Sequence, residues 1–535
     1  MEEKLNKKPC AVQKIETSQG FSVSYKEHLL YSKYNPKKNI ISAIENLQLL
    51  PGTIILGCSP VLAYGLKELT EKLSDNCLIL LCEAEKALYD FFIEEKLFNE
   101  ADTRIIFCPP DKLSELPIML YDFAATGLYK RVIRLDLSAG TQFNKELYDK
   151  LYSACSDSVM TFWKNRITLT KFGRRYSKNL FENLHYLASS KPLINFFSAV
   201  QRPILVFGAG QSTETFLSKY RISSENFFIL CADTALLPLL KHGIKVDGVF
   251  VEEAQSVIIK AFTGASKDIH IFAGLSSIPN LAHLKGYNNI SYFFTEYTQA
   301  EFLKKLETKE FMPPVNKPFG SVGLTAVYYA LKFRKDEKVP VYVCGLDFSY
   351  SSGLTHTKGA LAHLSRLITA NRLLPAQNYT AAYSIGADCI KDKAGRNFIT
   401  TPVLHNYAVM FTNIFSGTKN LFDFGDSGIE LGLPKKLPES EEKKADLIKN
   451  NSYTESQKNE IEAYLNEEKK ALEYLRDLLI GKTDFKGSKL FEEIQKNAAP
   501  REYLYLHFAD GWKFSTDQSF LNRIRTEIDF FLKYL

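Results

Sequence analysis

Two series of alternating strand and helix patterns constrain the fold of this chain more than any other feature. In the first series, short apolar runs alternate with helical periodicity at 53–59, 77–83, 104–108 and 130–137. The second series begins at 203 and places runs at 203–207, 227–231, 246–251, 268–274, 289–296 and 341–345. Strands separated by helices are typical of parallel sheets. We therefore predict the α/β class, with two Rossmann-like parallel-sheet domains followed by a helical C-terminal region.

The regions outside these two series have helical patterns. Residues 158–200 space their apolar positions by three and four, and 435–485 is a Glu- and Lys-rich helical stretch. The last fifty residues also show helical periodicity. The predicted domains are an N-terminal Rossmann-like domain at 1–157, a helical linker at 158–200, a central catalytic domain at 201–434 and a helical C-terminal domain at 435–535.

Composition excludes several classes of protein. A chain of 535 residues is too long for one core. Its net charge of +6 is small and its lysines are scattered, which argues against nucleic-acid binding. No apolar run is long enough to span a membrane, and the first ten residues lack the apolar core of a signal peptide. The nine cysteines form no CxxC pair and most lie in apolar runs, which predicts reduced thiols in a cytoplasmic protein.

The second series places polar and glycine residues where its strands end. Because ligands of parallel sheets bind beyond the carboxyl ends of strands, these residues are candidates for one site. They are Gly208, Gly210 and Ser212 in a glycine turn, Asp233 and Thr234 after the next strand, Glu252 and Glu253, Gly320 and Ser321 at a helix start, and Asp347, Tyr350 and His356 after the 341–345 strand. Glycine turns at helix starts bind phosphates through backbone N–H groups.

Each of these motifs also has a structural explanation. Glycines allow the tight turn between a strand and a helix without binding any ligand, and Asp233 is a suitable cap for the helix that follows it. Glu252 and Glu253 are consecutive, so at most one of them faces a crevice. In the first series, Gly57 precedes an acid by about 25 residues, as in nucleotide-binding domains, but the full GxGxxG pattern is absent. Ligand binding by the N-terminal domain stays open.

Four longer stretches resemble a known family. "GAGQS", "CADTALLPLLKHGIKVDGVFVEE", "GSVGLTAVYYAL" and "VYVCGLDFSYSSGLTH" occur in the order and at the spacing of the motility accessory factor family. That family is similar to bacterial flagellin glycosyltransferases and shares its central domain with a hydroxymethylpterin diphosphokinase. Residues 165–184 and 420–434 resemble the family's linker and closing segment, so the resemblance covers roughly 50–435.

The resemblance implies a function. The central domain is expected to be sialyltransferase-like and to use a CMP-activated sugar as donor substrate. The sugar is a nonulosonic acid of the pseudaminic or legionaminic type, and the acceptor is Ser or Thr of flagellin, in support of flagellar assembly and motility. No metal or other cofactor is assigned, because no DxD motif stands out, although Glu252, Glu253 and Asp347 are possible ligands. Oligomerisation stays open.

The resemblance also implies roles for single residues. Gly208, Gly210, Ser212, Asp233, Thr234, Gly320 and Ser321 would surround the nucleotide. Asp347 would order its turn, and Tyr350 would bind the leaving phosphate. His356 is a candidate general base on chemical grounds, because neutral imidazole suits proton abstraction near pH 7. Its place six residues after Tyr350 does not match the histidine of sialyltransferases. Glu252 is the alternative catalytic group. Gln211 replaces the family's usual proline, and Glu252-Glu253 replaces its usual Asp-Pro.

Two alternatives remain. The shared central domain also suits a diphosphokinase-type transferase that acts on a small pterin-like substrate. The departures at Gln211 and Glu252 suit a non-enzymatic flagellin adaptor or chaperone. The additional terminal domains favour the glycosyltransferase, because a protein acceptor needs a docking surface and a pterin does not.

Overall fold

The structure is a computed structural model, and it describes residues 12–74, 76–95, 102–283, 289–298, 300–377, 386–439 and 445–535. The chain forms two compact units. The first contains residues 1–172 and 505–514, and the second contains 173–504 and 515–535. Residues 1–11, with which the predicted N-terminal domain begins, lie outside the described residues. The division into four domains stays a prediction.

The first unit is built around a four-stranded parallel sheet in the order β6-β5-β4-β7. Its strands are β4 (Thr53–Cys58), β5 (Leu78–Cys82), β6 (Ile105–Cys108) and β7 (Arg131–Asp136). Its helices include α1 (Lys38–Glu45), α2 (Leu66–Lys72), α3 (Lys86–Glu94) and α4 (Leu116–Ala125), with 3₁₀ turns at Pro110–Glu115 and Ala139–Asn144. Both faces of the sheet are buried in apolar cores, as a parallel sheet requires.

A small antiparallel sheet precedes this parallel sheet. It consists of β1 (Gln13–Thr17), β2 (Gly20–Tyr25) and β3 (His28–Leu29). Val23 and Tyr25 of β2 pack into the core on one face of the parallel sheet. The sequence patterns did not predict this element.

One helix, α5 (Lys145–Leu187), contributes residues to both units. It is 43 residues long and contains most of the predicted linker, but it begins before residue 158. In the second unit, the side-chain amides of Asn179 and Asn183 donate to carbonyls of the loops that follow β10 and β11, namely Ala254, Leu275, Ser276 and Ser277. This half of α5 is therefore fixed to the carboxyl ends of those strands.

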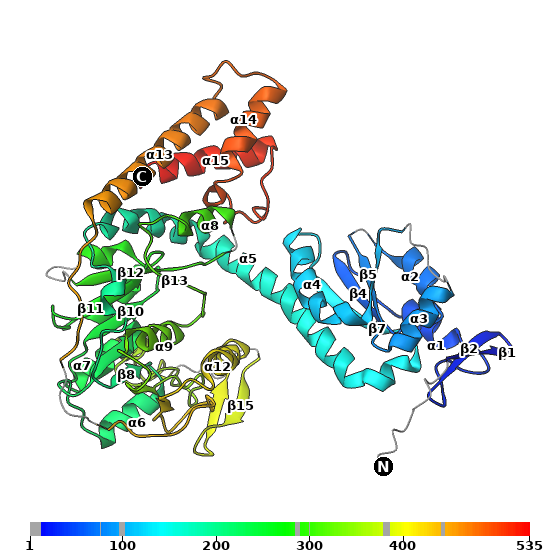
Figure 1. The fold of residues 1–535 in the computed structure, drawn as a ribbon, viewed down its shortest axis with the longest axis horizontal. Coiled ribbons are helices and arrows are strands. Elements are labelled where there is room, and N and C mark those ends of the chain that lie inside the picture. The colour runs from blue at the N-terminus through cyan, green and yellow to red at the C-terminus, as the bar shows by residue number, and fades with distance from the viewer. Residues whose placement is uncertain are drawn as a thin grey trace, which may run out of the picture. The chain divides into compact units, whose positions relative to one another are not determined.

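The second unit is built around an eight-stranded parallel sheet in the order β13-β12-β11-β10-β9-β8-β14-β17 (Figure 1). The strands are β8 (Ile204–Phe207), β9 (Phe228–Ala232), β10 (Gly248–Val251), β11 (His270–Gly274), β12 (Ile290–Thr295), β13 (Val315–Asn316), β14 (Val341–Cys344) and β17 (Leu421–Asp423). All of their pairings are parallel. The predicted strands of the second series are present, and the α/β class is confirmed.

Helices cover both faces of this sheet. α9 (Val322–Phe333) and α12 (Pro402–Phe415) share a core with Val206, Leu230 and Val343. On the other face, Phe216 of α6 (Gln211–Lys219) packs against Phe207. The remaining elements are α7 (Asp233–Lys241), α8 (Glu301–Glu307), α10 (Leu361–Thr369), the hairpin β15 (Asp388–Lys391) and β16 (Asn397–Thr400), and 3₁₀ turns at Leu193–Phe196, Ser256–Phe262 and Pro279–His283.

The helical C-terminal region is also confirmed, but its first helix begins at Glu455, and the described residues between 435 and 454 are not helical, contrary to the predicted start at 435. It comprises α13 (Glu455–Leu479), α14 (Ser488–Ala498), a 3₁₀ turn at Glu502–Leu504 and α15 (Gln518–Phe531). A cluster of aromatic rings joins it to the rest of the second unit, because Phe181 of α5 and Phe302 of α8 contact Tyr503, and Phe181 and Tyr503 contact Phe531. Within the described residues, no helix is long and apolar enough to cross a membrane.

Candidate functional site

The strand order of the larger sheet reverses between β8 and β14, and the turns that follow these two strands interlock. The amide of Gly208 donates to the carbonyl of Cys344, and the amide of Gly210 donates to that of Gly345, both at 2.8 Å. A Cβ on Gly208 would lie 2.3 Å from the oxygen of Gly345. These glycines are therefore required by the close approach of two backbones. Ligands of such sheets bind beside this switch point.

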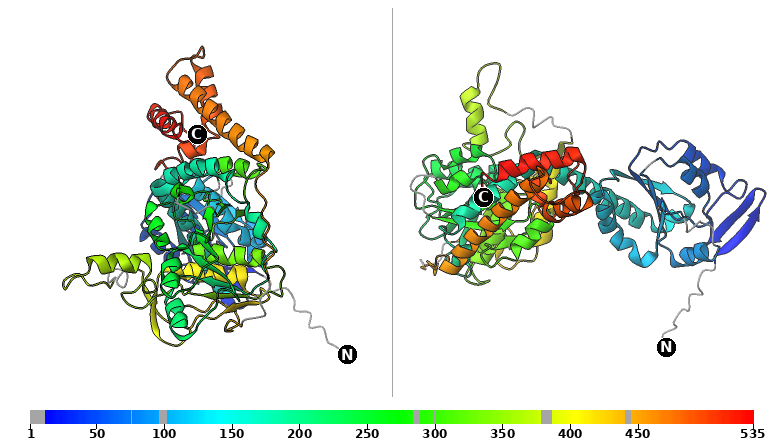
Figure 2. Two further views of the ribbon diagram at one scale, coloured as in Figure 1. Left: turned by 90° about the vertical axis from the view of Figure 1, so that its left-hand side faces the viewer. Right: turned by 90° about the horizontal axis from the view of Figure 1, so that it is seen from above.

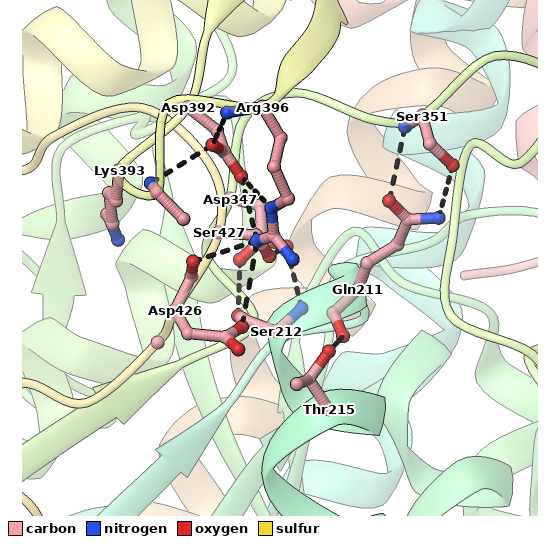
Figure 3. Close-up of polar contacts among 12 residues, drawn as sticks. Gln211, Ser212, Thr215, Asp347, Ser351, Asp392, Lys393, Arg396, Asp426 and Ser427 are labelled. Carbon is pink, nitrogen blue, oxygen red and sulfur yellow. Dashed lines mark hydrogen bonds and ion pairs between the residues drawn. The ribbon is translucent and has the colours of Figure 1, made fainter.

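Asp347 joins these two turns (Figure 3). Its carboxylate accepts hydrogen bonds from the amide of Ser212 (2.9 Å), from the Ser212 hydroxyl and from the Ser427 hydroxyl (3.0 Å). Asp347 is 2% exposed, and burial raises the pKa of its carboxyl group while the bonds from Ser212 lower it. A carboxylate thus occupies the start of α6, where the sequence placed a phosphate on Gly208, Gly210 and Ser212. Asp347 is a positioning residue at this turn.

Gln211 ties the same turn to the loop after β14. Its side-chain amide donates to the Ser351 hydroxyl (2.6 Å), and its side-chain oxygen accepts from the Ser351 amide (3.2 Å). Figure 3 shows both contacts. The residue that departs from the expected proline therefore makes two specific bonds. The adjacent Tyr350 is 4% exposed, and its backbone pairs with that of Ile399.

A buried ion pair lies next to this network, and sequence reasoning missed it. Lys393, in the turn between β15 and β16, pairs with Asp423 at the end of β17, and both side chains are at most 3% exposed. The charge of Lys393 also lowers the pKa of Asp347. Lysines in polar turns are common, so only the fold reveals that this one is buried.

His356 lies in a loop that is anchored to the switch point. The amide of the next residue, Thr357, donates to the carbonyl of Ala209 (2.8 Å), and a Cβ on Gly359 would lie 3.8 Å from Cα of Pro238 in α7. The loop therefore extends from the β8–α6 turn toward α7. Burial and the nearby charge of Arg366 lower the pKa of His356, so its imidazole is neutral at pH 7.

Arg366 of α10 is a second residue that sequence reasoning missed. Its Nε donates to the carbonyl of Ala376 (2.9 Å). Its buried Nη2 has no hydrogen-bond partner among the described residues, and an unpaired buried donor on a cation costs free energy. A carboxylate or phosphate is the natural partner of this group. The arginine sits within electrostatic reach of His356.

Two acids mark the carboxyl ends of β9 and β10, namely Asp233, which is buried, and Glu252, which is half-buried. Glu252 accepts hydrogen bonds from the hydroxyls of Thr295 and Thr325, both at 2.9 Å. Burial raises the pKa of Glu252, and these bonds partly offset the rise. Burial, together with the charges of Glu253 and Glu252, raises the pKa of Asp233 to about 7, although the amide of Thr234 donates to it.

The remaining predicted residues hold the backbone conformation of the turns in which they lie. Glu253 accepts from the amide of Gln255 (2.8 Å), so only Glu252 of the pair is bonded within the sheet edge. Gly320 has a φ of 69°, which favours glycine, and the ring of Tyr407 fills the space of its missing Cβ. The carbonyl of Ser321 accepts from the amides of Leu324 and Thr325 at the start of α9.

The predicted residues therefore fall into two groups. His356, Asp347, Gly208, Gly210 and Ser212 meet at the β8/β14 switch point, and Asp233, Thr234, Glu252 and Ser321 border the ends of β9 and β10. The described part of the chain has no group of three or more His, Cys, Asp or Glu residues that would hold a metal ion.

Two cavities lie away from this edge. One of about 300 Å³ is lined by Phe228, Asp247 and His270, at the amino ends of β9, β10 and β11. Another, of about 500 Å³, lies between the 3₁₀ turn at Leu193–Phe196 and the start of α13. We place the candidate site at the carboxyl edge, because Asp233 and Glu252 follow β9 and β10 there, and the loop that carries His356 is fixed there through Thr357 and Ala209.

Comparison with known proteins adds family context. Residues 174–353 match the family described as 6-hydroxymethylpterin diphosphokinase MptE-like. An uncharacterized protein of Treponema pallidum (strain Nichols) is 27% identical over 569 residues, which cover 97% of this chain and 94% of that protein.

A solved structure is similar over nearly the whole chain. The MAf glycosyltransferase from Magnetospirillum magneticum AMB-1 matches with a TM-score of 0.51 and 13% sequence identity. The match covers 98% of this chain and 90% of that protein. At this identity the likeness concerns the fold. The resemblance predicted from the sequence is confirmed at that level, with an MptE-like domain at the centre of the chain.

Proposed function

Because this chain carries an MptE-like domain within the fold of a MAf glycosyltransferase, we propose that it is a glycosyltransferase. Its donor in this proposal is a CMP-activated nonulosonic acid of the pseudaminic or legionaminic type, and its acceptor is Ser or Thr of flagellin. The observation that carries the proposal is the extent of the likeness, since it includes 98% of this chain and not the central domain alone. Such a protein would work in the cytoplasm, in support of flagellar assembly and motility.

The proposed reaction uses His356 as general base. The acceptor hydroxyl attacks the anomeric carbon of the sugar, the bond from that carbon to the phosphate oxygen breaks, and CMP leaves with the bonding electrons. The proton of the hydroxyl passes to the imidazole of His356. The lowered pKa of His356 supports this role, because a base must be unprotonated at the working pH.

Neighbouring residues take supporting roles in this proposal. Arg366 offers its unpaired Nη2 to an anionic group of the donor, the phosphate or the sugar carboxylate. Asp347 and Gln211 hold the two switch-point turns and the loop that follows β14. Asp233, Thr234, Gly320 and Ser321 border the ends of the adjacent strands, where the nucleotide would lie. Tyr350 and Glu252 are the remaining candidates for contact with the leaving group.

The proposal is tested by replacing the base. His356→Ala is expected to leave CMP binding, measured by calorimetry, nearly unchanged and to lower sugar transfer by roughly 10²–10⁴-fold. Transfer is measured as the mass increase of purified flagellin incubated with CMP-pseudaminic or CMP-legionaminic acid. His405→Ala is the matched control, because His405 is an exposed histidine of α12. Normal transfer by the His356 variant would remove the base assignment.

The family match at 174–353 supports one alternative function. A diphosphokinase would transfer the terminal diphosphate of ATP to the hydroxyl of 6-hydroxymethylpterin and release AMP. Incubation of the full chain with both compounds and Mg²⁺ distinguishes the two reactions. AMP release that depends on the pterin, without any transfer to flagellin, would replace the glycosyltransferase with this activity.

A further inference from the structure

The surface of α10 is apolar and uncovered. None of its residues is buried, and Ile368 is 86% exposed. Leu364 and Leu367 are exposed beside it, and Leu373, 91% exposed, and Leu374 continue the surface beyond the helix. Both views of Figure 2 show the yellow-green helix that follows residue 360 standing out from the body of the second unit. Large exposed apolar patches on proteins mark interaction sites.

The charge of this segment has one sign. Between Gly359 and Gly386 the sequence contains no Asp or Glu, whereas it contains Arg366 and Arg372. Arg372 is exposed next to Leu373 and Leu374. The surface formed by Leu364, Leu367, Ile368, Arg372, Leu373 and Leu374, here called the α10 surface, is therefore complementary to an apolar segment that carries acidic residues.

The α10 surface is adjacent to the candidate site. The loop that leads into α10 is fixed to the switch point through Thr357 and Ala209, and the amide of Lys358 donates to Glu214 of α6 (3.2 Å). On α10 itself, Arg366 is close enough to lower the pKa of His356. The same helix thus carries a charge that acts on His356 and an apolar surface that is exposed to solvent.

We propose that the α10 surface docks the acceptor polypeptide, through an amphipathic segment of the acceptor that combines apolar and acidic residues. This inference rests on the proposed transfer to a protein, because docking beside His356 would present the acceptor hydroxyl to the base. Residues that hold an acceptor near the reacting atoms raise the effective concentration of its hydroxyl.

Two other occupants fit the surface less well. A second copy would bring Arg372 of one chain to the same surface of the other, and like charges oppose such a contact. Amphipathic helices that bind lipid surfaces carry many Lys and Arg residues together with Trp or Phe, whereas 359–374 contains two arginines and no Trp, Tyr or Phe.

The experiment removes the apolar contacts without touching the site. The double variant Ile368→Asp/Leu373→Asp changes two highly exposed side chains, so the fold is expected to persist, and thermal melting checks this. Ile118→Asp, at a position 69% exposed on α4, is the matched control. The probe is purified monomeric flagellin, with affinity measured by calorimetry. We expect the double variant to bind flagellin about tenfold or more weakly, since central apolar anchors dominate interfaces, and to bind CMP as before.

The outcomes separate the docking inference from the proposed function. Full flagellin affinity in a folded double variant overturns the docking inference alone. Flagellin binding that is lost in the double variant, while the wild type transfers no sugar, supports docking and overturns the transferase. No binding of flagellin by the wild type overturns the docking inference. The double variant is also compared with the wild type in sedimentation with phosphatidylglycerol vesicles and in sedimentation velocity. If the variant no longer binds the vesicles, or no longer forms a dimer that the wild type forms, while its flagellin affinity is unchanged, the surface binds lipid or a second copy and the inference is overturned.

Discussion

The two parallel sheets have the same kind of switch point but differ in what surrounds it. In the first unit the strand order reverses between β4 and β7. The polar side chains that follow these strands form hydrogen bonds with one another. Glu83 accepts from Ser59 (2.7 Å), from Tyr148 (3.1 Å) and from the amide of Glu85, and Ser138 donates to Ser59. Glu83 is 1% exposed, and burial raises the pKa of its carboxyl group.

In the second unit, the interlocked turns are equally well bonded, but the residues beside them are not. Asp347 has its donors, whereas Arg366 has an unpaired buried nitrogen among the described residues, and His356 is neutral and half-buried. Topology alone therefore does not identify a ligand site. The difference lies in one polar atom, Nη2 of Arg366, which has no hydrogen-bond partner among the described residues.

The largest expected effects come from removing the central carboxylate of each switch point. Asp347→Ala leaves the Ser212 amide and the Ser212 and Ser427 hydroxyls without their acceptor, so we expect a loss of about 2–4 kcal/mol in unfolding free energy. Glu83→Ala is expected to destabilise the first unit comparably. Urea denaturation measures both changes.

The two variants are expected to differ in ligand binding. Asp347→Ala should weaken CMP binding in calorimetry because the switch-point turns lose their link, whereas Glu83→Ala should leave CMP affinity unchanged. Asp347→Asn, which keeps an acceptor oxygen, is the matched control. Loss of CMP binding in a folded Glu83→Ala protein would show that the first unit holds the nucleotide.

Much of the architecture was accessible from the sequence, because it depends on local patterns. The apolar runs at 53–59 and 203–207 became β4 and β8, since buried parallel strands need continuous apolar residues. The polar residues that follow these strands lie at the carboxyl edge of the larger sheet, and their roles in a site stay predictions. The antiparallel sheet of β1–β3 was missed because its strands are short and mostly exposed.

The details of the site depended on tertiary contacts and were not accessible in the same way. The turn at Gly208 looks like a phosphate loop, but its glycines are required by the facing turn at Gly345. Lys393 is separated by 30 residues from its partner Asp423, and nothing local distinguishes a buried cation from a solvated one. Asp347 was expected to order its turn, and its carboxylate does accept a hydrogen bond from the amide of Ser212.

The next largest effect concerns the dependence of stability on pH. The pKa of Asp233 is raised by burial to about 7, from an ordinary value of 3.8. A raised acid binds its proton more tightly in the folded state, so its contribution to stability is full at low pH and is lost as pH rises toward 7. Asp233→Asn keeps an acceptor for the Thr234 amide and removes the buried charge.

We therefore expect Asp233→Asn to be more stable than the wild type by roughly 1–3 kcal/mol at pH 8, with the difference shrinking toward pH 5. Urea titrations at both pH values measure it. The exposed Asp268, replaced by Asn, is the control. A constant difference between the two pH values would contradict the raised pKa.

A smaller effect is expected from the unpaired guanidinium nitrogen, which is the feature that most distinguishes the two switch points. Arg366→Lys keeps the charge but loses the fork that suits a carboxylate or phosphate. We expect this variant to bind a CMP-sugar about tenfold more weakly, as loss of one charge-assisted hydrogen bond predicts, with its unfolding free energy nearly unchanged. Equal affinity of wild type and variant, measured by calorimetry, would exclude Arg366 from the site.

The smallest effect is expected at Gln211, which fixes the start of α6 to Ser351 through two hydrogen bonds. Gln211→Ala removes both hydrogen bonds. Because the side chain is half-buried, water can replace some of these bonds, so we expect the unfolding free energy to fall by about 0.5–1.5 kcal/mol. Gln211→Pro should lose the same bonds but recover part of the stability, since proline suits the first position of a helix. Urea denaturation ranks the three proteins. A proline variant less stable than the alanine variant would mean that the amide of residue 211 is itself bonded, which would extend the network around Asp347 by one donor.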